Sequence, residues 1–191
     1  MKFKYLKHIE LPYNFRESSW SICPFTGALL KSKPLDEVPQ TIPLKILNAL
    51  EYCESPYLLK SNHEKHISPI DLTLITSLNK MHERLLKIDN SRFYLTRLYS
   101  SIKHDIFDTT SLSMIYINMI PQQIEQRHRL CLQKSFLASK ISKGFVENGV
   151  LFIGAFLPTG DMHAWIIEND IQPDIEDRGW VNYRPLLAFY H

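Results

Sequence analysis

A cysteine and a histidine in the last third of the chain have the types and order that a thiol hydrolase needs. Cys131 opens a helical pattern at 130–144, where backbone N–H groups and the helix dipole favour the thiolate. His163 stands in a strand pattern at 162–168, two positions before Trp165, so both side chains should share one face of a sheet. An imidazole presented there can accept the thiol proton and later protonate a leaving amine.

A third group must orient the imidazole, and Asp174, after a short turn, is the candidate. Nearby acidic residues are rivals that the sequence leaves open: Asp170, Glu176 and Asp177. The basic run Arg127-His128-Arg129 before the cysteine would also favour a thiolate. Each residue alone has a structural explanation, because a lone helical cysteine is usually a small buried hydrophobe. An aspartate that follows a proline, as Asp174 does, more often stabilises a turn than takes part in catalysis.

The first third of the chain predicts short strands followed by one helix. Residues 2–10 are a strand pattern, and 18–30, with Pro24 and Gly27, favours a hairpin. A proline-rich connector leads to a helix at 43–53 that has Pro43 in its first turn. The apolar face of this helix is either Leu44, Leu47 and Leu50 or Ile46 and Leu50. The polar stretch 55–69 is the candidate linker.

The rest of the chain predicts helices and then a short sheet. A helix begins near Ser68-Pro69, as an N-cap followed by proline at the first position, and ends near Ile88. Further helices are expected at 91–104, at 111–128, where Pro121 breaks the helix, and at 130–144, where a left-handed Gly144 ends it. Two strands are expected at 149–157 and 162–168 around a turn at 158–161. A short element near the C-terminus closes the chain.

Composition excludes several classes of protein. The 191 residues are 45% hydrophobic, which is enough for a core, and the formal net charge of +2 argues against a nucleic-acid protein. The sequence shows no signal peptide and no apolar run long enough to span a bilayer. Three cysteines, an odd and sparse number, fit a reducing compartment. We therefore expect a soluble cytoplasmic protein that binds neither nucleic acid nor membrane.

Metal and phosphate sites have weak support. The segment His63 to His66 lacks the four-residue histidine spacing of zinc proteases, and Cys23 and Cys53 lack the spacing of metal ligands. The chain has only 6 glycines and no glycine-rich phosphate loop. No bound metal or cofactor is expected.

The residues around Cys131 and His163 resemble a known family. Cys131-Leu132 with Ser135, then Phe152 to Ala155, then His163 to Ile166, are similar to the motifs of the B-protein leader peptidases of lasso-peptide biosynthesis. These enzymes are transglutaminase-like cysteine proteases, and the resemblance covers about 130–175. The segment "SWSICPFTGALL" resembles an early motif of the microcin-type, single-chain members, in which a precursor-recognition part is fused ahead of the protease part.

The resemblance implies an α+β fold in two parts: a small N-terminal β/helix leader-recognition domain at 1–60, and a helical segment with a transglutaminase/papain-like cysteine protease core and a short antiparallel sheet at 61–191. It implies removal of the leader from a ribosomally made precursor peptide by Cys131, His163 and Asp174. A partner macrolactam synthetase, an asparagine-synthetase-like C protein that uses ATP, would then close the ring. Glutamines upstream of the nucleophile, Gln123 and Gln126, are candidate oxyanion donors.

Two departures from the family pattern concern the end of the motif. Glu168 stands one place later than the family's glutamate, and Asp174 falls about one residue early, as a one-residue deletion in the turn would produce. Two other functions stay open: a different transglutaminase-like amidohydrolase or acyltransferase, and a non-catalytic leader-binding module with a structural Cys131. For leader recognition we expect strand addition to the N-terminal sheet, beside the helix at 43–53.

Overall fold

The computed structural model describes most of the chain in nine stretches. These are residues 7–11, 13–15, 18–23, 27–32, 41–60, 71–88, 105–120, 130–174 and 179–191. Several expected features lie outside the described residues, namely the helix at 91–104, the cap at Ser68-Pro69, Pro24, Pro121, and the His63–His66 segment.

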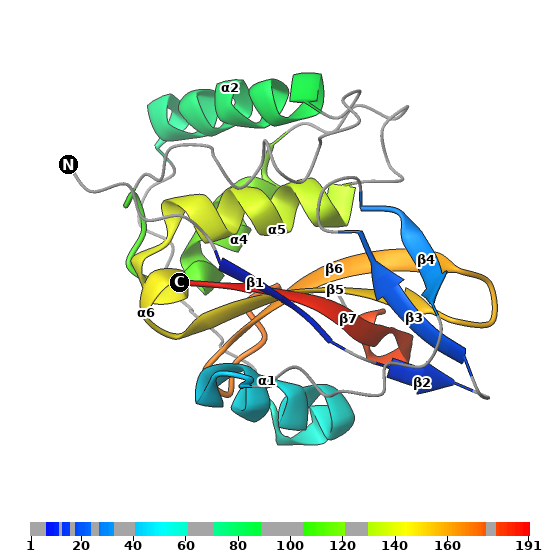
Figure 1. The fold of residues 1–191 in the computed structure, drawn as a ribbon. Coiled ribbons are helices and arrows are strands. Elements are labelled where there is room, and N and C mark those ends of the chain that lie inside the picture. The colour runs from blue at the N-terminus through cyan, green and yellow to red at the C-terminus, as the bar shows by residue number, and fades with distance from the viewer. Residues whose placement is uncertain are drawn as a thin grey trace.

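A four-stranded antiparallel sheet is the centre of the fold, in the order β1-β7-β5-β6 (Figure 1). Its strands are β1 (Lys7–Glu10), β5 (Gly149–Phe156), β6 (Asp161–Glu168) and β7 (Arg184–Tyr190). The predicted strand pair around the turn at 158–161 is confirmed, with Gly160 at a φ of 80°. The prediction of a short closing element near the C-terminus is wrong in extent, because β7 is a long strand in the interior of the sheet. Its Pro185 is accommodated beside a register shift at Ile153/Gly154.

A second antiparallel sheet of three strands, β2-β3-β4, forms from the N-terminal part. Its strands are β2 (Tyr13–Phe15), β3 (Ser18–Ile22) and β4 (Leu29–Ser32). The predicted hairpin is confirmed as the β3–β4 pair, in which Ile22 lies opposite Leu29. Gly27 has a φ of 73° in the connecting turn, a conformation that favours glycine because it has no Cβ.

Helix α1 (Leu44–Glu54) confirms the helix predicted at 43–53 and settles which face is buried. Ile46 and Ala49 are buried, whereas Leu44 is 72% exposed and Leu47 is 47% exposed. The Leu44-Leu47-Leu50 version of the apolar face is therefore wrong. A short 3₁₀ turn, η1 (Pro56–Leu58), follows where a linker was expected.

Three further helices lie on the opposite face of the sheet from α1 (Figure 1). They are α2 (Leu72–Ile88), α4 (Thr110–Asn118) and α5 (Leu130–Ile141). The side chain of Asp71 caps α2, because its Oδ1 accepts hydrogen bonds from the backbone N–H groups of Thr73 and Leu74.

Gly144 corrects the predicted end of the helix at 130–144. Helix α5 ends at Ile141, and a separate helix α6 (Lys143–Asn148) begins after Ser142, whose hydroxyl accepts the backbone N–H of Phe145. Gly144 therefore lies inside α6 and is not a left-handed cap. Glycine is needed there for space, because an added Cβ would meet the carboxylate of Glu168.

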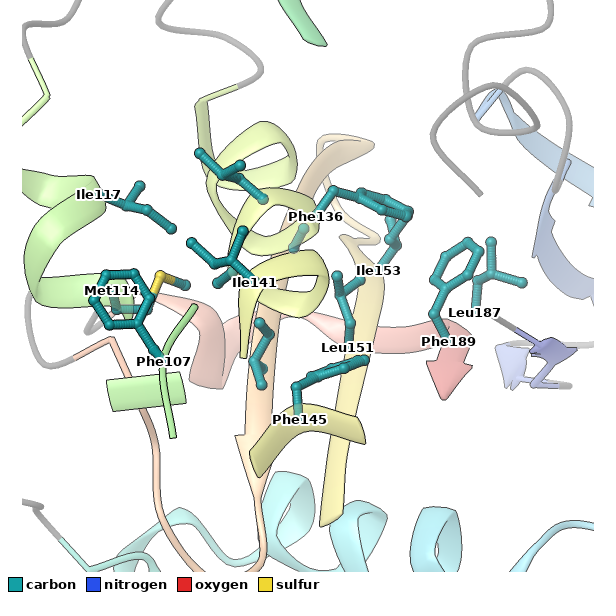
Figure 2. Packing of buried hydrophobic residues seen from close by; sticks show 14 of the residues in the cluster. Phe107, Met114, Ile117, Phe136, Ile141, Phe145, Leu151, Ile153, Leu187 and Phe189 are labelled. Atoms are coloured by element: carbon teal, nitrogen blue, oxygen red, sulfur yellow. The ribbon is translucent and has the colours of Figure 1, made fainter. Parts of the chain in front are cut away.

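Two buried clusters cover the two faces of the central sheet. The larger one, the α5-face cluster, joins side chains of α2, α4, α5 and α6 to Leu151, Ile153 and Phe189 (Figure 2). The smaller one, the α1-face cluster, joins Ile46 and Ala49 of α1 to the other face of the same strands.

The mixed helices and antiparallel strands make this an α+β protein, as predicted. The ranges 1–60 and 61–191 share packing, because β1 pairs with β7 and α1 packs on β5 and β7. The assignment of 1–60 to recognition stays a prediction about function, since packing alone does not assign it. Within the described stretches, no helix is both long and apolar enough to cross a membrane.

Candidate active site

Cys131 is the second residue of α5 and is half-buried, as expected for a thiol near a helix start. It packs against the α5-face cluster together with Met162 of β6. The sequence predicted a thiolate at Cys131 from its place in the helical pattern, and that stays a prediction. The basic run before it and the two candidate oxyanion donors, Gln123 and Gln126, lie outside the described residues.

The other two cysteines differ from Cys131 in their surroundings. All three are present as thiols. Burial raises the pKa of the Cys53 thiol to about 12, because the charged form is poorly solvated in the α1-face cluster. Cys53 is therefore neutral and a poor nucleophile at ordinary pH. Cys23 lies in the β3–β4 turn, where its backbone N–H donates to the carbonyl of Ala28.

His163 lies near the start of β6, opposite Gly154 of β5. Its ring stacks on Trp165, with the ring centroids 6.2 Å apart and the planes inclined by 14°, so the predicted shared face is confirmed. The ring of Tyr183 also contacts the imidazole, and the centroids of the two rings lie 5.1 Å apart. Gly154 gives this stack room, because an added Cβ would come within 2.8 Å of the Trp165 ring.

Helix α5 runs alongside β6 in the same direction, which brings Cys131 to the end of β6 that carries His163. The hydroxyl of Ser135 donates to the carbonyl oxygen of Ala164 over 3.3 Å. Beyond the far end of α5, Gly144 of α6 lies against the carboxylate of Glu168, the last residue of β6. Cys131, one helical turn before Ser135, therefore lies level with the first residues of β6.

The thiol and the imidazole reach this end of β6 from its two faces. Side chains alternate along a strand, so Met162 and Ala164 face α5, whereas His163 and Trp165 face α1. Cys131 packs against the same cluster as Met162 and Ala164, so it lies on the α5 face. The structure thus brings Cys131 and His163 to the same place along β6 but not to the same face.

Asp174 is hydrogen-bonded to the layer of helices on the α5 face. The Nδ2 group of Asn118, at the end of α4, donates to its Oδ1 over 3.2 Å, and Nζ of Lys134 donates to Oδ1 of Asn118 over 2.7 Å. Lys134 lies one turn after Cys131 on α5. The side chain of Gln172 donates to the backbone carbonyl of Asp174 over 2.7 Å.

The rivals of Asp174 fare differently. Asp170 forms a salt bridge with Lys60, whose hydrogen bond lowers the pKa of that carboxyl. Its half-buried carboxylate is engaged by Lys60 just beyond the end of β6 opposite to His163, which weakens it as the third member. Glu176 and Asp177 lie outside the described residues.

Sequence reasoning missed the partners that hold the candidate site. Asn118 contacts Asp174, and Lys134 contacts Asn118. Tyr183 contacts His163. Each of these partners comes from another element of the fold. No motif links these pairs, because contacts between distant segments leave no local periodicity. In the described stretches, no group of three or more His, Cys, Asp or Glu side chains could hold a metal ion.

Comparisons with protein-family models, with curated proteins and with solved structures found no match to this chain.

Proposed function

We propose that this chain is a cysteine peptidase with a transglutaminase-like core, in which Cys131 is the nucleophile, His163 the base and Asp174 the orienting carboxylate. One observation carries the proposal: α5 brings a half-buried thiol at its start to the end of β6 where His163 lies. Among the described strands, β6 lies at the edge of its sheet, beside β5. The proposal requires the Cys131 thiol and the His163 imidazole to meet around this edge, because they belong to opposite faces of β6.

The chemistry is acyl transfer in two steps. The Cys131 thiolate attacks the carbonyl carbon of the scissile peptide bond, and the His163 imidazolium gives its proton to the leaving amine. Water then attacks the thioester, with His163 as its base, and restores the thiol. Backbone N–H groups at the start of α5 are the donors for the oxyanion that forms in each step.

The proposed substrate is the leader of a lasso-peptide precursor, and the support for it is the sequence resemblance around Cys131 and His163. The reaction frees the amine of the core peptide, which an ATP-dependent macrolactam synthetase then joins to a core carboxylate. For leader docking we propose strand addition to the β2-β3-β4 sheet, whose edges are β2 and β4. Another transglutaminase-like amidohydrolase or acyltransferase would use the same three residues on a different substrate.

A non-catalytic leader-binding module is the second candidate, and one observation favours it. Cys131 packs with the α5-face cluster while His163 stacks on Trp165 of the other face. In such a module Cys131 is a packing residue, and the thiol gains nothing from the imidazole.

Alkylation of the intact protein separates the two candidates without a substrate. Iodoacetamide labelling at pH 6, followed by peptide mapping, measures the rates at Cys131 and Cys53 in one sample. The peptidase predicts that Cys131 reacts at least about tenfold faster than Cys53 and that His163→Ala removes most of this advantage. Equal rates, or a His163→Ala variant that labels like the wild type, would contradict the proposed pair.

A further inference from the structure

A series of aromatic rings runs from the buried α1-face cluster to His163. Trp180 of η3 (Trp180–Asn182) stacks on Trp165 at 5.8 Å and 19°, and Trp165 stacks on His163 at 6.2 Å. The series continues through Tyr183 to Phe156, whose ring centroids lie 6.3 Å apart. Trp180 and Trp165 are each 2% exposed, whereas the imidazole and the Tyr183 ring are half-exposed. The imidazole therefore stands where a rigid stack reaches the surface.

Tyr183 approaches the imidazole from a part of the backbone that is itself well fixed. Its N–H donates to the carbonyl of Trp180 over 2.9 Å, which closes the η3 turn. The next residue, Arg184, begins β7, a strand paired on both sides, with β1 and with β5. The position of the Tyr183 ring is thus set by the interior of the sheet rather than by a surface loop.

Contact with two aromatic rings restricts an imidazole. The His163 and Trp165 rings are stacked with planes inclined by 14°, and the Tyr183 ring is tilted by 38° against the imidazole with the centroids 5.1 Å apart. Rotation of the imidazole about its Cβ–Cγ bond would drive its edge into one of them. A base held in this way presents its nitrogen atoms in a fixed direction, which a proton transfer requires.

We propose that Tyr183 is a positioning residue that holds the imidazole of His163 for the reaction at Cys131. For its catalytic consequence, this inference rests on the proposed function. The inference assigns this role to the ring of Tyr183, and Tyr183→Phe tests whether the hydroxyl takes part. Other ionisable side chains near this end of β6 are Asp161 on β6, Arg184 on β7 and Cys131 on α5, and each stays in place in the variants below.

Two variants of the full-length protein test whether the aromatic ring of Tyr183 is needed. Tyr183→Phe keeps the ring, and Tyr183→Leu removes it. The first readout is the ¹H–¹³C spectrum of the histidine rings, with the His163 signal assigned by its loss in His163→Gln. A ring in face contact displaces the Hε1 signal upfield. The second readout is kcat and KM for precursor cleavage, and a thermal melt confirms folding.

Positioning predicts an upfield His163 signal in the wild type and in Tyr183→Phe, and a shift towards the free-imidazole value in Tyr183→Leu. It also predicts a kcat about tenfold lower in Tyr183→Leu, with KM within about twofold. A Tyr183→Leu protein with the wild-type signal and kcat would overturn the inference, as would a Tyr183→Phe protein that behaves like Tyr183→Leu. If Tyr183→Leu does not fold, Tyr183→Met replaces it. A wild type that cleaves no precursor defeats the proposed function, while the ring signal still decides the contact.

Discussion

The two faces of the central sheet are built from different kinds of side chain. Helices α2, α4, α5 and α6 pack on the α5 face, and buried hydroxyl and amide groups lie among its apolar side chains, including Ser113, Gln133, Ser135 and Ser139. Helix α1 packs on the α1 face, whose centre is the ring pair Trp165 and Trp180. The Cys131 thiol belongs to the first face and the His163 imidazole to the second.

This difference suggests a division of labour. Under the proposed function, the α5 face holds the nucleophile on a packed and hydrogen-bonded helix, and the α1 face holds the base on a stack of rings. A site at the border of the two needs both faces intact. Substitutions that weaken one face at a time can therefore show whether the two faces are one unit.

The largest effects should come from removing a buried ring on either face. Phe136→Ala on α5 and Phe152→Ala on β5 each delete a ring that is 0% exposed, which should lower the free energy of unfolding by about 3–5 kcal/mol. Since both faces share β5 and β7, each variant should shift a single thermal transition. Phe156→Ala, a half-exposed site on the same strand, is the control with a smaller loss. Two separate transitions in either variant would mean that the faces unfold independently.

Glu168 should show how strongly polar contacts secure the α5 face. The backbone N–H of Thr110, the first residue of α4, donates to its Oε2 over 2.9 Å, so a negative charge meets the positive end of the helix dipole. Glu168→Gln should lower the free energy of unfolding by about 1–2 kcal/mol in urea titrations. Glu147→Gln, on an exposed site of α6, should change it little. If the two substitutions lowered the free energy of unfolding equally, the contact of Glu168 with the start of α4 would not stabilise the α5 face.

His82 should make the α5 face sensitive to acid. It is 5% exposed on α2, and burial lowers its pKa from 6.5, with the charge of Lys134 acting in the same direction and that of Glu83 against it. The folded protein therefore binds fewer protons than the unfolded chain, so stability is full above about pH 6.5 and falls as the pH drops through that value. Relative to His82→Leu, the wild type should lose free energy of unfolding between pH 7 and pH 5, as urea titrations at the two pH values would measure. Parallel stability curves of the two proteins would contradict this.

The smallest effect concerns α1, the helix that packs on the other face. Leu44 is 72% exposed, so Leu44→Ala should change the free energy of unfolding by less than about 0.5 kcal/mol. Ile46, 0% exposed on the same helix, is the matched site, and Ile46→Ala should cost about 2–5 kcal/mol. A large loss in Leu44→Ala would show that its side chain is covered in solution.

Local sequence patterns predicted the elements whose cause is local. Proline and glycine around 24–27 indicated the β3–β4 hairpin, and the apolar run at 149–157 indicated the interior strand β5. The position of Cys131 at a helix start and the shared face of His163 and Trp165 follow from the same kinds of pattern. These properties depend only on neighbours in the chain.

The features that the sequence did not predict all depend on distant segments. β1 pairs with β7 from the other end of the chain, which joins the expected recognition segment to the C-terminal sheet. Gly144 was expected to end a helix, because nothing near it shows that the Glu168 carboxylate lies against it. The face on which Cys131 lies relative to His163 depends on how α5 packs on β6, and periodicity within each element does not encode that.

Cleavage of a precursor peptide tests the central claim most directly. Mass spectrometry would follow a lasso-type precursor peptide after incubation with the wild type, Cys131→Ala and His163→Ala, with a macrolactam synthetase present in a parallel series. Cys53→Ala is the matched control, since burial of this thiol raises its pKa to about 12 and leaves it neutral. The account predicts release of the leader by the wild type and by Cys53→Ala, and an intact precursor with the other two variants. Full cleavage by folded Cys131→Ala or His163→Ala would contradict it.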